Sequence, residues 1–258
     1  MIGTTLAGMM KVKIYGTRKK MGYAAASMVA ERIRNLLQQQ EVVNIVFAAA
    51  PSQLEMLEAL RKEVVDWERV NAFHMDEYIG LPAGAVQSFG FFLKKELFSQ
   101  LPFRNVFYIN GACSDPQSEC ERYSQLLEAF PTDIVCMGIG ENGHLAFNDP
   151  PVANFKDPVR VKIVTLDNEC RQQQVNDGCF PSLDTVPEKA ITLTIPALMA
   201  AAYISCVVPG ERKAQAVYNT MYENIDTRFP STVLREHAKV ILFLDEASAA
   251  KTTFIKTV

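Results

Sequence analysis

A histidine and a carboxylate stand close together after a glycine-rich turn in the middle of the chain. The run Gly138-Ile139-Gly140-Glu141-Asn142-Gly143 leads directly to His144, and Asp149 follows shortly after it. An imidazole exchanges protons near neutral pH, and a carboxylate beside it can take part in acid–base chemistry. The short apolar run 133–137 ahead of the turn predicts a buried strand of a parallel sheet. Because ligand crevices lie at the carboxyl ends of such strands, we expect both side chains to project into a site.

The glycine spacing also matches G-x-G-x-x-G, which is the fingerprint of dinucleotide-binding folds. That fingerprint needs a helix directly after it, whose N-terminus holds the pyrophosphate. Here Asn148-Asp149-Pro150-Pro151 follows almost at once, and proline interrupts a helix at that point. The motif also lies in mid-chain instead of opening a domain. A nicotinamide or flavin site is therefore the weaker interpretation, and we expect no cofactor.

Two further polar clusters follow predicted strands and could join the same site. They are His74-Met75-Asp76-Glu77-Tyr78 and Arg212-Lys213. The carboxyl ends of parallel strands share one edge of a sheet, so Asp76, His144 and Lys213 can converge there. A carboxylate, an imidazole and a cation suit proton transfer on a small phosphorylated substrate. Such an anion needs a local positive site because the chain as a whole is acidic.

Each of these residues also has a structural explanation. Asp76 and Glu77 could cap the next segment or lie in a turn, and His144 could be a satisfied structural histidine. Lys213 at a helix start opposes the helix dipole, and this local conflict favours a functional role. His74, Asp76 and His144 could also hold a metal ion. Two histidines and one acid so far apart in sequence are a weak pattern, however, and we expect no metal.

Composition limits the class of protein. The chain has 258 residues, 48% of them hydrophobic, with a net charge of −3 and a pI of about 5.7. This predicts one domain over residues 1–258 and gives no indication of a nucleic-acid partner. No apolar run approaches the ~20 residues of a membrane span, and the N-terminus does not resemble a signal peptide, so we expect no membrane partner. The six cysteines lack C-x-x-C spacing, which fits a cytoplasmic protein.

Strand-like and helix-like segments alternate along the chain with short connections. This order predicts an α/β fold, with a Rossmann-like, open and mostly parallel sheet and helices on both faces. Ser52 is a candidate helix N-cap, with Glu55 completing a capping box, and Asp245 is a candidate cap of a last helix. Residues 1–8 are interpreted as a frayed or partner-contacting segment. Strands are predicted at 11–15, 42–47, 70–75, 106–109, 133–137, 161–165, 190–194, 203–208 and 240–244, and helices at 21–40, 52–64, 87–100, 118–130, 169–177, 196–201 and 209–221.

Two long segments resemble the signatures of the glucosamine-6-phosphate deaminase (isomerase) family. They are Phe73 to Leu81 (FHMDEYIGL) and Gly138 to Pro150 (GIGENGHLAFNDP). Residues 207–217 (VVPGERKAQAV) look like the phosphate-lysine segment of that family, and the similarity runs in order from about Val43 to Glu246. The 6-phosphogluconolactonases share this fold and part of the glycine–histidine motif. The resemblance is therefore less specific for the substrate than for the superfamily.

The resemblance implies a reaction and roles for particular residues. Asp76 would move a proton between C2 and C1 of the opened sugar, with Glu77 supporting it. His144 would help to open the ring, oriented by Asn142 and Asp149. Glucosamine 6-phosphate would become fructose 6-phosphate and ammonia without a cofactor, as expected of a deaminating aldose–ketose isomerase and hydrolase. The family often forms homo-oligomers, so a homo-oligomer is also implied.

The resemblance further implies a phosphate site. Lys213 would hold the 6-phosphate together with backbone N–H groups of the turn that contains Ala49, Ala50 and Ser52, and Arg212 could add a second cation. The family turn usually reads Thr-Gly-Ser/Gly-Thr-Pro, whereas this chain has Ala-Ala-Pro-Ser-Gln. Two alternatives therefore stay open. One is a related enzyme acting on galactosamine 6-phosphate or 6-phosphogluconolactone, and the other is a non-catalytic sugar-phosphate-binding protein.

Overall fold

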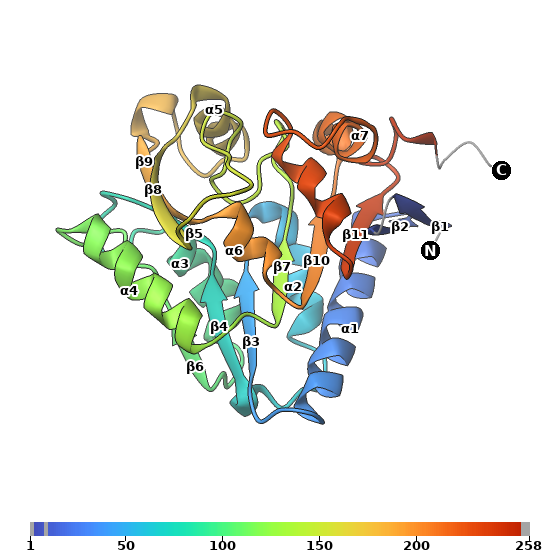
Figure 1. Cartoon of the computed structure of the whole chain (residues 1–258), viewed down its shortest axis with the longest axis horizontal. Helices are drawn as coiled ribbons and strands as arrows, with labels where there is room; N and C mark the ends of the chain where they lie inside the picture. Colours follow the sequence, from blue (N-terminus) through green and yellow to red (C-terminus); the bar gives the residue numbers. More distant parts are fainter. Residues whose placement is uncertain (1–2, 8–9, 254–258) are drawn as a thin grey trace.

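The computed structural model describes residues 3–7 and 10–253, which form a large twisted sheet with helices on both faces (Figure 1). Every neighbouring pair in this sheet is parallel except β1 and β2. In sheet order the described strands are β1 (Gly3–Ala7), β2 (Met10–Tyr15), β11 (Val240–Asp245), β10 (Tyr203–Val208), β7 (Ile134–Met137), β3 (Val43–Phe47), β4 (Val70–His74) and β6 (Asn105–Phe107).

The central strands are apolar throughout because both faces of the sheet are covered. Along β3, Ile45 and Phe47 belong to one buried cluster and Val46 to the other, as the alternation of side chains along a strand requires. The first cluster packs under α1 (Arg18–Leu37), α2 (Leu54–Leu60) and α3 (Phe89–Leu93), and the second under α4 (Pro116–Ala129), α6 (Ile195–Met199) and α7 (Ala214–Tyr222). The predicted fold class is therefore confirmed.

A second, three-stranded sheet lies beside the carboxyl ends of the large one. It is antiparallel and contains β5 (Asp76–Tyr78), β9 (Lys189–Leu193) and β8 (Val161–Thr165). Helix α5 (Asn168–Asn176) follows β8 above it (Figure 1). The predicted strands at 161–165 and 190–194 exist, but they belong to this smaller sheet. Asp76-Glu77-Tyr78 is a strand and not only a polar strand end, because β9 supplies its hydrogen-bonding partner.

Three local predictions were wrong. Residues 3–7 are not frayed, because they pair with β2 as β1, whereas residues 1–2 and 8 lie outside the described part. Contact with a partner, the other interpretation of this segment, stays a prediction. Ser52 caps no helix, since a 3₁₀ turn η1 (Pro51–Gln53) begins one residue earlier, with Ala50 at the N-cap and proline in the first helical position. Glu55 forms an ion pair with Arg18 instead of completing a capping box.

Asp245 also differs from its prediction as a helix cap. Its carboxylate accepts hydrogen bonds from the N–H groups of Ser248 and Gly210, so it ties the end of β11 to the loop after β10. Only turns follow it as far as Thr253. Shorter helical turns complete the described chain at Trp67–Arg69 (η2), Lys94–Phe98 (η3, a π turn), Leu183–Thr185 (η4), Glu211–Lys213 (η5) and Pro230–Glu236 (η6).

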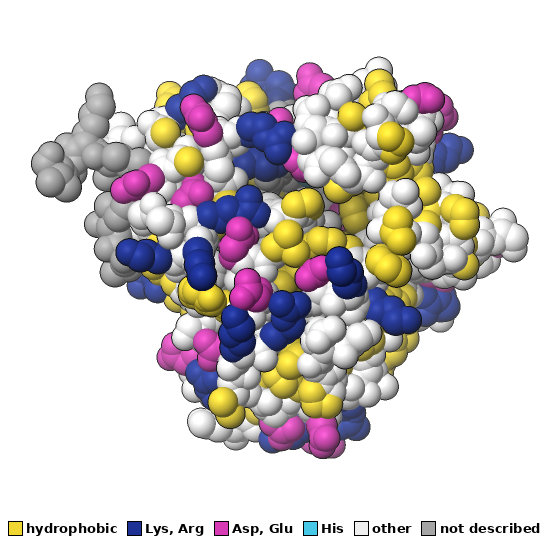
Figure 2. Space-filling model, turned by 180° about the vertical axis from the view of Figure 1, so that it is seen from behind, with side chains coloured by type: hydrophobic (Ala, Val, Ile, Leu, Met, Phe, Trp, Pro, Cys, Tyr) yellow, Lys and Arg dark blue, Asp and Glu magenta, His cyan; other side chains and the backbone are white. Residues whose placement is uncertain are grey.

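Charges of both signs mix on the surface seen from behind. Figure 2 shows Lys and Arg side chains interspersed with Asp and Glu around hydrophobic patches on that face. Such a mixture creates no large field of one sign there. Among the described helices, none combines the length and the hydropathy needed to cross a bilayer.

Candidate active site

A cleft opens where β3, β4, β7 and β10 end at their carboxyl edge. It encloses about 530 Å³ of empty space, part of which is continuous with solvent. Asp76, His144 and Lys213 each follow a predicted strand, so they are expected to meet at one edge of the sheet. All three line this cleft. The predicted site residues on its wall are Ala49, Ala50, Ser52, Asp76, His144 and Lys213.

Asp76 presents a nearly buried carboxylate to the cleft. The side chain accepts no hydrogen bond from any described residue, and the residue is 7% exposed. Burial, followed by the nearby Glu77 charge, raises the pKa of Asp76 well above its usual range. A carboxyl group that gains and loses its proton closer to neutral pH is suited to general acid–base chemistry.

The backbone of Asp76 is fixed by two neighbours. Its strand pairs with β9 at Thr192, and His74 Nδ1 lies 2.9 Å from the Asp76 carbonyl oxygen. His74 Nε2 accepts the N–H of Ile109 at 2.9 Å, so the proton of the imidazole resides on Nδ1. Burial lowers the pKa of His74 to about 4. His74 is therefore a neutral positioning residue, with both ring nitrogens in use.

Glu77 points away from the cleft, because successive side chains of β5 face opposite sides. Its carboxylate accepts the N–H groups of Tyr78, Phe89 and Gly90 at 2.8–3.1 Å and so holds the start of α3. Burial raises the pKa of Glu77 to about 7, although these three hydrogen bonds oppose the shift. Phe89 lines the cleft, whereas Glu77 does not. The structure thus corrects the place expected for Glu77: it supports the site through α3 instead of lying in it.

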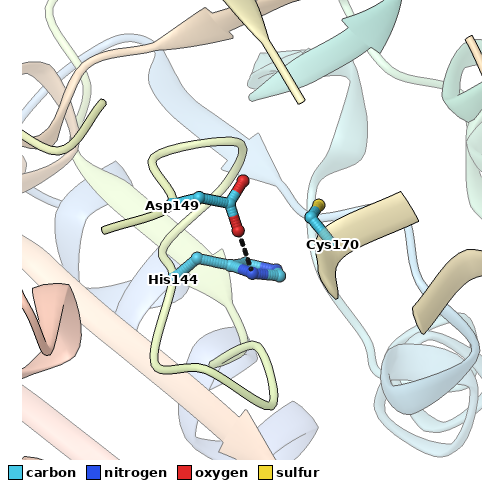
Figure 3. Close-up of side chains that lie close together, drawn as sticks. All are labelled: His144, Asp149 and Cys170. Carbon is cyan, nitrogen blue, oxygen red and sulfur yellow. Dashed lines mark ion pairs between the residues drawn. The ribbon is translucent and has the colours of Figure 1, made fainter. Parts of the chain in front are cut away.

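His144 forms a compact polar group with Asn142 and Asp149. His144 Nδ1 lies 2.9 Å from Asn142 Oδ1 and 3.0 Å from Asp149 Oδ1, and Asn142 Nδ2 donates to the same Asp149 oxygen at 2.9 Å. Figure 3 shows the imidazole and the Asp149 carboxylate facing each other. Two acceptors at Nδ1 fix the proton there and leave Nε2 as the basic nitrogen. Asn142 and Asp149 lie behind His144 and do not line the cleft.

Asp149 is almost completely buried, yet it remains an anion. Burial works to raise its pKa, but the charge of His144 and the hydrogen bonds from His144 and Asn142 outweigh burial, and the pKa is lowered. A buried carboxylate next to Nδ1 stabilises an imidazolium whenever Nε2 takes up a proton.

The glycine-rich turn is shaped around the imidazole. Gly140 N–H donates to the carbonyl oxygen of His144 at 2.9 Å. A Cβ atom on Gly140 would lie only 2.2 Å from His144 Cε1, so no larger residue fits without moving the ring. Ala146, which also lines the cleft, adopts a left-handed backbone with φ of 50°. Strained backbone of this kind is concentrated at functional sites.

One group among the described residues has the ligand types for a metal ion. His144, Asp149 and Cys170 place their ligand atoms within 4.8 Å of one another, and Figure 3 shows Cys170 reaching towards the pair from α5. The hydrogen bonds among His144, Asn142 and Asp149 account for this arrangement without a metal. Burial, then the Asp149 charge, raises the pKa of Cys170 well above its usual range, which opposes the thiolate that a metal needs.

The cleft also contains groups that could interact with an anion. Lys213 is 9% exposed, and its ammonium group makes no hydrogen bond or ion pair with any described residue. Burial lowers its pKa. No described backbone carbonyl accepts a hydrogen bond from the N–H groups of Ala49, Ala50 or Ser52, which also line the cleft. An unpaired cation together with free amide donors is the usual composition of a phosphate site.

Arg212 does not belong to this anion site. Its guanidinium pairs with Asp177 at 2.5 Å and with Glu141 at 3.5 Å, and it does not line the cleft. The structure therefore corrects the expectation of a second phosphate cation, because the charge of Arg212 is already compensated. These pairs join the start of η5 to the glycine-rich turn and to the end of α5.

Several residues that line the cleft carry no chemical signal in the sequence. Gln53 Nε2 donates to the carbonyl of Val207 at 3.1 Å, while its buried Oε1 has no hydrogen-bond partner among the described residues. Gln173 and Gln174 reach the cleft from α5, and Gln173 Oε1 accepts the N–H of Glu141 at 3.1 Å. Gln53 follows the predicted phosphate turn and could have been found there, whereas tertiary packing alone places α5.

Sequence comparison identifies the family of this chain. The profile of the family "Glucosamine-6-phosphate isomerases/6-phosphogluconolactonase" matches residues 16–242. A glucosamine-6-phosphate deaminase from Bacillus cereus (strain B4264) is 32% identical over 237 residues, covering 92% of this chain and 87% of the relative. The corresponding protein from Bacillus thuringiensis (strain Al Hakam) is 33% identical over the same shares.

Comparison with solved structures indicates the same family. A solved monomeric glucosamine-6-phosphate deaminase superposes with a TM-score of 0.85 at 30% identity, covering 93% of this chain and 98% of the other. A 6-phosphogluconolactonase from Thermotoga maritima shares the fold, with a TM-score of 0.74 at 20% identity over 91% and 98% of the two chains. With its profile match, its close relatives and this cleft, the chain belongs to the family of glucosamine-6-phosphate isomerases and 6-phosphogluconolactonases.

Proposed function

We propose that this protein converts glucosamine 6-phosphate and water to fructose 6-phosphate and ammonia. One observation carries the proposal: a single cleft is lined by an unpartnered carboxylate, an oriented imidazole, an unpaired lysine and amide donors without a backbone acceptor. The choice of substrate rests on the relatives named glucosamine-6-phosphate deaminase, which are 32–33% identical over nearly the whole chain.

Binding starts at the phosphate end. Lys213 and the N–H groups of Ala49, Ala50 and Ser52 would surround the 6-phosphate, which replaces the hydrogen bonds that these groups lack. This arrangement also explains why the alanines of the turn are tolerated, since it is the main chain and not the side chain that donates. Anchoring the phosphate directs the other end of the sugar towards Asp76 and His144.

Ring opening is the first chemical step. His144 Nε2 takes the proton of the C1 hydroxyl, and the C1–O5 bond breaks as a proton returns to O5, which leaves a free aldehyde. Asp149 stabilises the transient imidazolium through Nδ1, while Asn142 fixes the orientation of the ring.

Isomerisation follows on the opened sugar. Asp76 removes the proton from C2, and the electron pair forms a C1–C2 double bond as the carbonyl oxygen at C1 is protonated. Returning a proton to C1 converts this enolamine into an imine at C2, which water hydrolyses to the ketone and ammonia. The net reaction consumes one water molecule, which is the sense in which a hydrolase label would apply. Side chains and water suffice for every step.

The lactonase relatives supply the second candidate, which is hydrolysis of 6-phosphogluconolactone. That reaction uses the same phosphate site and a base, but no proton leaves carbon. The family profile covers both activities. The lactonase neighbour at 20% identity supports only the fold, so the deaminase remains our preferred assignment.

Ammonia release from glucosamine 6-phosphate by the purified chain tests the proposal. We expect ammonia and fructose 6-phosphate in equal amounts. In D₂O the product should carry deuterium at C1 to the extent that the proton held by Asp76 exchanges with solvent before its return. The Asp76→Asn variant should lose about 10²–10⁴-fold in turnover. Galactosamine 6-phosphate and 6-phosphogluconolactone serve as parallel substrates. Lactone hydrolysis without ammonia release from either amino sugar would overturn the deaminase, and binding without turnover of any substrate would point to a non-catalytic protein.

A further inference from the structure

A second hollow lies near the amino ends of the strands of the large sheet, between α1 and the start of β10 and β11. It encloses about 1000 Å³ of empty space, part of it open to solvent, which suits a small molecule. Because the candidate active site lies at the carboxyl ends of the strands, the two hollows are separated by the length of the sheet. No step proposed above uses this second hollow.

The polar lining of this hollow is cationic. Lys11, Arg32 and Lys239 contribute to its wall, and no acidic residue does. None of the three forms an ion pair with any described carboxylate. The Arg32 guanidinium lies 3.9 Å from the ring centroid of Tyr203, and Lys239 Nζ lies 4.5 Å from it. The ring lies close to both cations without neutralising either, and this favours binding of an anion.

Ser205 supplies an independent observation. It lies on β10, lines the hollow and is 6% exposed, yet its hydroxyl has no hydrogen-bond partner among the described residues. A buried hydroxyl without a partner costs about 1–3 kcal/mol. A polar atom of a bound molecule, reaching between the strands and α1, would satisfy it.

The rest of the wall is apolar and includes Met28 and Val29 from α1, with Ile134 and Ile241 from the sheet. We propose that this hollow binds a small organic anion with an apolar body. Its phosphate or carboxylate group lies among Arg32, Lys239 and Lys11. Its body packs against the apolar wall, where a polar atom meets Ser205.

Calorimetric titration of the full chain with phenyl phosphate and with benzoate tests this site, with uncharged phenol as the reference. The Lys213→Met variant is the background, because it removes the cation of the active-site cleft and leaves the second hollow unchanged. We expect at least one of the two anions to bind in the millimolar range or tighter, and the tighter one identifies the preferred head group. The double variant Arg32→Gln/Lys239→Gln should bind it about tenfold more weakly or not at all.

Two further variants complete the test. Ser205→Ala should weaken a ligand that carries a polar atom beside its ring, such as salicylate, more than it weakens benzoate. Lys20→Gln, a charge change at an exposed position of the same helix, should leave binding unchanged. Thermal melting of each variant verifies folding.

Several results would overturn the proposal. They are the absence of binding by both anions, equal binding of phenol, or full retention of binding in the double variant. Conversion of a dimeric chain to a monomer by that double variant would show that the hollow is a contact between subunits and not a ligand site. None of these results bears on ammonia release, so the two proposals can fail separately.

Discussion

Two buried ionisable side chains without partners, Asp76 and Lys213, mark the cleft at the scale of single residues. Both have a pKa shifted by burial towards the neutral form. Groups of this kind weaken a fold while preparing it for a ligand, since the ligand supplies the interactions that the protein omits. The buried carboxylate of Asp149 differs because His144 and Asn142 compensate it.

Replacement of Asp76 by asparagine should separate stability from activity. The pKa of Asp76 is raised in the folded chain above the unfolded value of about 3.9, so the ionised group destabilises the fold progressively as the pH rises above about 4. At pH 8 we expect Asp76→Asn to unfold about 2–4 °C higher than the parent chain, which corresponds to ~1 kcal/mol. Near pH 4 the difference should vanish.

Thermal melting across this pH range checks the prediction. The exposed carboxylate Glu188, replaced by glutamine, is the control and should show no such trend. A variant at Asp76 that is less stable than the parent chain at pH 8 would show that the carboxylate has a structural partner.

The two neighbouring cations Lys213 and Arg212 should differ sharply when each is removed. A charge-assisted hydrogen bond to phosphate contributes about 1.5–3 kcal/mol, so Lys213→Met should raise KM for the sugar phosphate about 10–100-fold with little change in kcat. Arg212→Gln breaks only partly exposed ion pairs to Asp177 and Glu141, and KM should change less than ~5-fold. Steady-state measurement of KM and kcat for the two variants tests this difference. Equal effects would place Arg212 in the phosphate site after all.

At the scale of elements, the glycine-rich turn after β7 is the part that fixes the imidazole. Gly140→Ala should push the His144 ring away from Asn142 and Asp149, because the new Cβ cannot share its space. A misplacement of this size costs about 10²-fold in rate. We expect kcat to fall by that order while KM stays within a few-fold, since the proposed phosphate cation Lys213 is not part of this turn. An unchanged kcat would show that the ring can shift without loss of function.

The parallel sheet could be predicted from the sequence because most of its strands are short, largely apolar runs, several of which are followed by a glycine or a polar cluster. The smaller sheet could not. Asp76-Glu77-Tyr78 has no strand pattern, and its partner Lys189–Leu193 lies far along the chain. Pairing between such distant segments depends on tertiary structure, which local propensity does not encode.

The residues of the candidate site likewise include some that the sequence predicts and some that it does not. Asp76, His144 and Lys213 could be predicted because rare residue types follow predicted strands, and the parallel topology brings strand ends together. Glu77 was misplaced because only the pairing of β5 decides which face a side chain takes. Arg212 was misplaced because its partners come from a different loop and helix.

At the scale of the whole molecule, the residues that line the cleft come from both sheets, the loops after their strands and helix α5. The resemblance to the family implies a homo-oligomer, whereas one structural relative is a monomer. Because the residues that we propose for acid–base chemistry and phosphate binding all lie in the described part of one chain, we expect turnover without assembly.

Specific activity should therefore stay constant when the protein is diluted about a thousandfold, even where sedimentation shows that the state of association changes, because dissociation removes no residue from the cleft. The measurement is ammonia release per milligram at each concentration, with the mass of the particle followed in parallel. The variant Lys213→Met, assayed at saturating substrate, is the control. A loss of activity that this variant also shows on dilution does not depend on phosphate binding by Lys213. A fall in activity that tracks dissociation would mean that a second chain completes or orders the site.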